Sequence, residues 1–66
     1  MKLNWKRNYG DGSETDDTVL WINGKPTTNI ISQVGAIYFY YVNDVEMGMA
    51  DSRAEAKRYI LEELGL

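Results

Sequence analysis

AIYFYYVND (residues 36–44) is the stretch of this sequence that decides the fold, because four aromatic side chains follow one another from Tyr38 to Tyr41. Its aromatic and β-branched composition predicts a β-strand over residues 36–42, ended by a turn. Successive side chains of a strand point to opposite faces of a sheet, so both faces of this strand are apolar or aromatic. One face can form a core, and the other needs a different explanation.

Four further segments have the pattern of short strands or extended chain. Bulky and polar residues alternate in the first of them, and Asn23-Gly24 ends the second with a dipeptide that tolerates the positive φ of a tight turn. The third is β-leaning but fits no clean period, so it predicts a short strand or an extended crossing segment. In the fourth, Val45, Met47 and Met49 alternate and are expected to point inward. In order, the segments are 2–9, 18–24, 27–35 and 45–50.

The segment DSRAEAKRYILEELGL (51–66) predicts a helix. Asp51 or Ser52 is the expected N-cap, and Glu55 stands three residues after Ser52, which is the spacing of a capping box. Gly65 occupies the position at which helices end in a left-handed conformation. One apolar stripe with a spacing of four residues is formed by Ala56, Ile60 and Leu64.

These elements predict the α+β class: an antiparallel sheet of three to five short strands, with one C-terminal helix packed on one face. The 66 residues provide material for a single domain, residues 1–66, with one small core. A helix of about 13 residues is roughly 20 Å long and covers one face of a small sheet. The other face is therefore left to solvent or to a partner.

The side chains of the aromatic strand divide into two sets by alternation. We expect Ile37, Phe39 and Tyr41 to face the helix, because Ile37 and Phe39 have no polar tip. Tyr38 and Tyr40 would then lie on the helix-free face of the sheet.

The composition removes the residues of most catalytic chemistry. The chain contains no cysteine and no histidine, so it lacks the commonest general base, the commonest metal ligand and any thiolate. We therefore expect no enzyme activity, no metal site and no cofactor. Its net charge of -3 gives no general attraction to phosphates, and favours a basic or protein partner over nucleic acid.

The acidic segment GDGSETDD (10–17) contains no hydrophobic residue, which predicts a loop between strands. Oxygen-bearing residues stand at alternate positions in it, as in loop-type calcium sites, at Asp11, Ser13, Thr15 and Asp17. The EF-hand pattern requires a glycine at its sixth position and a glutamate at its twelfth, where this chain has Asp16 and Ile22. A solvated connection without metal is the interpretation that this departure favours.

The candidate binding residues follow from the helix-free face. Tyrosine and tryptophan are enriched as anchors in protein interfaces, which favours Tyr38 and Tyr40, joined by Trp5 from a neighbouring strand. The acidic loop is expected at the rim, where its charge would suit a basic groove on the partner. The candidate acidic residues are Asp11, Glu14, Asp16 and Asp17. Core completion, base stacking and a homodimer through the same face are the alternatives.

Two nucleic-acid-binding families share features with the last third of the chain. YFYYVNDVEMGMADSRAEAKRYI (38–60) resembles the end of the three-strand-plus-helix arm-type DNA-binding domains of phage integrases and the related plant AP2 fold. MGMADSRAEAKRYILEEL (47–64) is similar to the closing segment of double-stranded-RNA-binding domains. The resemblance implies a strand-to-helix architecture. It makes a nucleic-acid-binding module the alternative function, without transferring any binding residue.

The chain as a whole resembles the small acidic proteins that bacteriophages encode to block host machinery, anti-CRISPR proteins among them. Its size, its lack of a catalytic set and its acidic loop beside an aromatic sheet carry this resemblance. The resemblance implies a stoichiometric inhibitor that acts by occlusion. The start MKLNWKRNYG (1–10) has no apolar core of signal-peptide length and no membrane-length apolar run follows, so we expect a soluble protein of the host cytoplasm.

Overall fold

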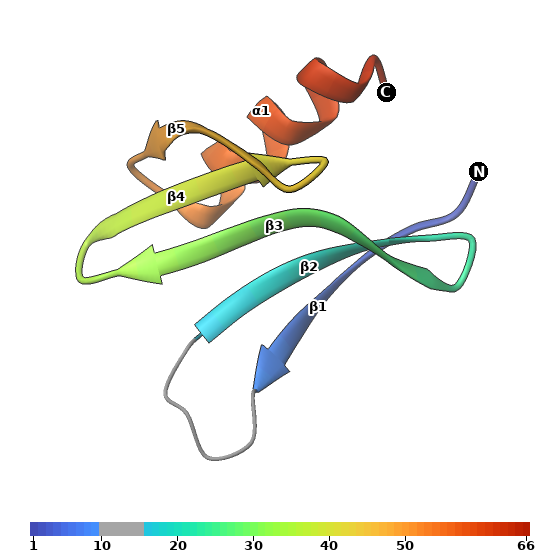
Figure 1. Ribbon diagram of the computed structural model, residues 1–66, viewed down its shortest axis with the longest axis horizontal. Helices are drawn as coiled ribbons and strands as arrows, with labels where there is room; N and C mark the ends of the chain where they lie inside the picture. The colour runs from blue at the N-terminus through green and yellow to red at the C-terminus, as the bar shows by residue number, and fades with distance from the viewer. Residues whose placement is uncertain (10–15) are drawn as a thin grey trace.

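A computed structural model describes residues 1–9 and 16–66 of the chain, and they form a five-stranded antiparallel sheet with one helix on one side (Figure 1). The strands lie side by side in the order of the sequence, so each pairs with its chain neighbour. The predicted α+β class, with an antiparallel sheet and a C-terminal helix, is confirmed. The elements are β1 (Leu3–Tyr9), β2 (Asp16–Ile22), β3 (Lys25–Val34), β4 (Ile37–Val42), β5 (Val45–Ala50) and α1 (Arg53–Leu64).

Two tight turns depend on residues that adopt a positive φ. Asn23 and Gly24 join β2 to β3 with φ values of 53° and 79°. Asn43 and Asp44 join β4 to β5 with φ values of 51° and 68°. Two successive positive φ values are typical of the two-residue hairpin turn whose twist matches that of its strands. The two turns predicted from the sequence are therefore confirmed.

The ends of α1 are fixed by local hydrogen bonds. Ser52 is the N-cap, and its Oγ accepts a hydrogen bond of 3.1 Å from the backbone N–H of Glu55. Gly65 ends the helix with a φ of 75° and donates its N–H to the carbonyl of Glu62. Both cap positions agree with the sequence pattern.

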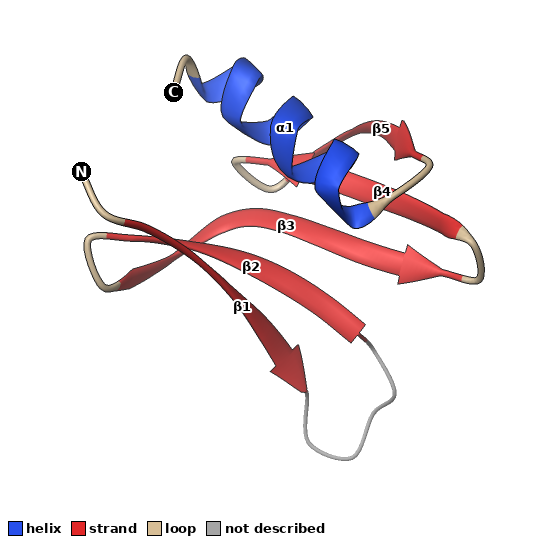
Figure 2. Cartoon of the chain, turned by 180° about the vertical axis from the view of Figure 1, so that it is seen from behind, coloured by secondary structure: helices blue, strands red, loops and turns tan. Residues whose placement is uncertain are grey.

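The core lies between α1 and one face of the sheet. The helix runs mainly over β4 and also contacts β3 and β5, as Figure 2 shows from behind. Ala56 and Ile60 are its fully buried residues. They pack on buried side chains of four strands, which are Leu20, Ile31, Val42 and Ala50.

The expected division of the aromatic strand is wrong. Tyr40 is the cross-strand partner of Ile31, which is 1% exposed and belongs to the core, so Tyr40 shares the helix side. Tyr38 lies two residues before Tyr40 and packs against the same core. Phe39 and Tyr41 therefore point away from the helix, as does Ile37 at the start of β4.

Small residues of β5 explain this choice of face. Tyr38 pairs with Ala50 and Tyr40 pairs with Gly48, whose added Cβ would lie 3.6 Å from the Tyr40 hydroxyl. The tyrosine rings use the space above these small residues, and the helix can approach closely there. Met47 and Met49 alternate with them and point outward, so the expectation that they face the core is also wrong.

A buried polar network holds an irregular part of β3. Val19 pairs with Ile30 but Trp21 pairs with Pro26, so the segment 27–29 lies opposite the single residue Leu20. The hydroxyl of Thr27 donates to the Leu20 carbonyl at 2.7 Å and accepts from the amide of Asn29. The Asn29 side-chain oxygen accepts the backbone N–H of Asn43 at 2.9 Å. The network therefore satisfies backbone groups of the bulge and of the β4–β5 turn.

Replacing Asn29 with alanine should lower the free energy of unfolding by about 2 kcal/mol, because the Asn43 N–H loses its buried acceptor. Asn29 is 2% exposed, so water cannot readily replace the lost oxygen. Chemical denaturation measures the change. Thr28→Ala, at the exposed neighbouring position, is the control and should change the free energy by less than about 0.5 kcal/mol. Equal effects of the two substitutions would contradict the proposed role of the network.

Candidate interaction surface

The side of the sheet opposite α1 carries a continuous set of apolar side chains, which we call the helix-free face. They come from β2, β3, β4 and β5, and alternate with the core residues of the same strands. Its apolar members are Val19, Trp21, Ile30, Val34, Ile37, Phe39, Tyr41, Met47 and Met49, of which Val19 is already buried within the single chain at 9% exposure.

No element of the described part of the chain covers this face. Val34 is 61% exposed, Ile37 45% and Met49 62%, which is high for large apolar side chains that lie together. Contiguous exposed apolar patches are uncommon on monomeric proteins, and they mark surfaces that contact another molecule. The helix-free face is therefore the candidate interaction surface.

Three shallow hollows lie along the helix-free face. Their lining residues come from the strands and turns, and none comes from α1. The central hollow lies against Ile30, Ser32 and Tyr41 and has a volume of about 220 Å³. The hollow toward β5, of about 300 Å³, lies between Phe39 and Met49. Such open depressions suit the side chains of a partner surface better than an enclosed small molecule.

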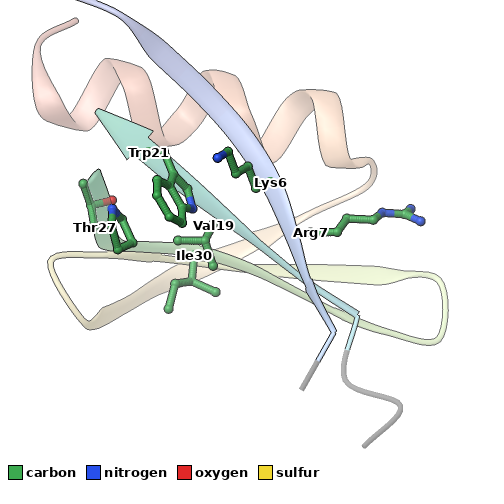
Figure 3. A pocket seen from close by; sticks show the side chains of 7 residues that line it. Lys6, Arg7, Val19, Trp21, Thr27 and Ile30 are labelled. Atoms are coloured by element: carbon green, nitrogen blue, oxygen red, sulfur yellow. The ribbon is translucent and has the colours of Figure 1, made fainter. Parts of the chain in front are cut away.

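The third hollow, of about 350 Å³, lies at the β1–β3 end of the face (Figure 3). Lys6, Val19 and Ile30 come from three neighbouring strands and gather around it with Trp21, whereas the Arg7 side chain extends away. The Lys6 Nζ lies 4.0 Å from the centroid of the Trp21 ring, a cation–π contact. This end of the face is therefore positively charged.

Acidic groups lie at the β5 end of the face and around its central hollow. Glu46 is the cross-strand partner of Tyr41 and lines the same hollow as Phe39. Asp17 and Asp44 line the central hollow. The helix-free face thus has a cation at β1 and an anion at β5, with apolar groups and two further carboxylates between them.

The three aromatic residues predicted as anchors lie on the helix side instead. The rings of Tyr40 and Tyr59 have centroids 5.5 Å apart. The guanidinium of Arg53 lies 5.3 Å from the Tyr38 ring centroid, and the Lys57 Nζ lies 5.6 Å from the centroid of Trp5. Each predicted anchor is thus partly buried beneath a side chain of α1.

The structure describes the positions of only some of the predicted acidic residues. Asp11 and Glu14 lie outside the described residues. Asp16 is in β2, but only its strand position is described. Asp17 pairs with Ser32 and stands on the helix-free face, so it is the acidic candidate whose side chain the structure places on the surface.

Sequence reasoning missed the residues that make up this face, and one signal could have found them. In the run MGMA (47–50), glycine and alanine alternate with methionine. A helix packs more closely over small residues, so Gly48 and Ala50 indicate the covered side and the methionines the open one. Tyr38 and Tyr40 are then on the covered side, because they pair with these small residues.

Within residues 1–9 and 16–66, no three acidic side chains gather closely enough to hold a metal ion. The helix in this part of the chain is not long and apolar enough to cross a membrane. Comparison of the chain with protein-family models, curated proteins and solved structures gave no match. Function therefore has to be argued from the surface itself.

Tyr40→Ser should lower the free energy of unfolding more than Phe39→Ser does. Tyr40→Ser removes a ring that packs on Tyr59 and Gly48, and should lower the free energy of unfolding by about 2 kcal/mol or more. Phe39→Ser on the helix-free face should change it by about 1 kcal/mol or less. Urea denaturation at low protein concentration compares the two. A larger loss for Phe39→Ser would place the core on the other face.

The hydroxyl of Tyr59 gives the helix a measurable pH dependence. It donates a hydrogen bond of 3.0 Å to Glu55 Oε1, and this bond, with burial and the carboxylate charge, raises the pKa of Tyr59 above its ordinary value of 10.0. Because the pKa is higher in the folded chain, the stabilisation is present below pH 10 and is lost as pH rises through the folded pKa. Tyr59→Phe should be less stable than the wild type at pH 8, with a smaller difference at pH 11, as measured by urea denaturation. A difference that stays constant would exclude the hydrogen bond as its cause.

Proposed function

We propose that this protein is a non-enzymatic binding protein that docks its helix-free face on a protein partner and so occludes a functional site there. The observation that carries the proposal is the exposed apolar set on β3, β4 and β5, with Val34, Ile37 and Met49 all more than 40% exposed. Burial of this set on a partner would supply the apolar contact that drives association.

The composition of the face supports a protein partner. Aromatic residues and methionine are enriched in the centres of protein interfaces, and this face presents Trp21, Phe39 and Tyr41 with Met47 and Met49. Its charged groups stand at the margins, where they affect orientation and association rate more than affinity. The partner would therefore present an apolar patch flanked by charges of both signs.

In this proposal the protein acts as a stoichiometric inhibitor of its partner. A short chain that covers a partner's surface acts stoichiometrically, as the phage proteins that block host machinery do. Asp17, Asp44 and Glu46 on the face suit a partner whose site is basic, such as a nucleic-acid-binding groove. In this proposal the protein acts in the cytoplasm of a host cell.

A nucleic-acid-binding role is the second candidate, supported by the stacked pair Lys6 and Trp21. Aromatic rings beside cations are the usual components of single-strand platforms. The acidic groups on the same face and the net charge of -3 oppose it. We expect no mobility shift of duplex DNA, duplex RNA or single strands at low salt. A shift that weakens steeply as salt rises would favour this candidate over a protein partner.

Affinity capture from the native host tests the protein-binding proposal. A partner retained by the wild type should be lost when Phe39 and Met49 are both changed to serine, with an affinity loss of about thirtyfold or more for two central anchors. Val45→Ser is the matched control: Val45 is 60% exposed but pairs with the core residue Val42, on the helix side. Capture that survives the double substitution, or that Val45→Ser abolishes equally, would reject the helix-free face as the binding surface.

A further inference from the structure

One row of residues crosses the whole helix-free face from edge to edge. Lys6 pairs with Val19, Val19 with Ile30, Ile30 with Tyr41, and Tyr41 with Glu46. Directly paired residues point to the same side, so the row has a cation at one edge, three apolar groups between, and an anion at the other edge. The middle of the row, Ile30, is on the central strand of the five.

This row is complementary to itself under one rotation. A two-fold axis through Ile30 and within about 15° of the β3 direction places β1 of one copy over β5 of the other. Lys6 then faces Glu46 of the second copy, Val19 faces its Tyr41, and Ile30 meets its equivalent. The contact repeats in the opposite sense, so two Lys–Glu pairs flank an apolar centre.

From this complementarity we propose that, without another partner, the helix-free face is covered by a second copy of the same chain. The result is a two-layered sandwich with a helix on each outer side. Two aligned sheets pack about 10 Å apart and cross at about 30°, which displaces the ends of the row by roughly 5 Å. The long, flexible Lys6 and Glu46 side chains span that offset.

The charges select this axis over the other in-plane axis. A two-fold axis perpendicular to the strands would place Lys6 over Lys6 and Glu46 over Glu46, and like charges repel. The charges of Lys6 and Glu46 therefore favour this arrangement over the other in-plane axis.

The size of the face suits a homodimer. The principal extents of the chain, 31 and 24 Å, set an upper limit of roughly 700 Å² on the face, slightly below the ~800 Å² that each partner buries in a standard interface. A 66-residue chain with one thin core also gains a second apolar layer from association. The dimer uses the same surface as the proposed function, but does not depend on the existence of another partner. It would have to dissociate before that partner binds.

Sedimentation equilibrium of the full chain tests the dimer. The wild type should sediment with twice the chain mass at micromolar concentration. Lys6→Glu and Glu46→Lys should each raise the dissociation constant by roughly tenfold or more, because each variant makes both pairs repulsive. A wild type that stays monomeric at millimolar concentration, or that forms larger rings or filaments, would overturn the inference.

Mixing the two single variants tests the Lys6–Glu46 pairing most directly. An equimolar mixture of Lys6→Glu and Glu46→Lys chains restores opposite charges at both contacts, so heterodimers should form with about the wild-type dissociation constant. A chain that carries both Lys6→Glu and Glu46→Lys should also form homodimers with about the wild-type dissociation constant. Arg58→Glu, on the outer side of α1 with 64% of its side chain exposed, is the control for net charge and should change nothing.

Net charge alone predicts the opposite result for one variant. Glu46→Lys reduces the negative charge of the chain, so general repulsion would strengthen its dimer, whereas the proposed pairing weakens it. No rescue in the mixture would overturn the inference. If the monomeric Lys6→Glu chain still captures a host protein, the proposed function stands regardless of the dimer. If the dimer forms but no partner is captured, the dimer inference is supported and the proposed function is not.

Discussion

Close contact between α1 and one side of β4 is the constraint on which the rest of the structure depends. Ala56 and Ile60 approach the sheet where β5 carries Gly48 and Ala50, whose small side chains leave room for the tyrosine rings beneath the helix. Once that side is covered, alternation sends Phe39 and every second neighbour to the other side. Residues 1–9 and 16–66 contain one helix and no second element for that side, so the sheet carries more apolar side chains than its own core uses.

The exposed side chains of the helix-free face have a definite order across the sheet. Apolar groups of the open side extend from β2 to β5, while Lys6 and Glu46 stand on the two edge strands in one cross-strand row. A surface that only completed a core would have no reason to order its charges in this way. Apolar burial supplies affinity without direction, and the two charges supply the direction. The two proposals therefore place a second copy and a different protein with a matching pattern on the same face.

Much of the fold follows from local chemistry that the sequence displays. The Asn23-Gly24 turn and the Ser52 cap act within a few residues, so short patterns predict them. The periodicity of β3 could not be interpreted from sequence, because the residues opposite Leu20 bulge and Thr27 and Asn29 satisfy the freed backbone groups. The choice of buried face does not follow from the polarity of single side chains, because it depends on the space that a helix requires over β5.

Assignment of nuclear Overhauser effects from the aromatic rings tests the central claim most directly, namely that the helix covers the side of β4 with Tyr38 and Tyr40. Isotope filtering separates effects within one chain from those between copies. The account predicts intrachain effects between the Tyr40 and Tyr59 rings, whose centroids are 5.5 Å apart, and none from Phe39 to the helix. Intrachain effects that join Phe39 or Tyr41 to Ile60, with none from Tyr40, would contradict it.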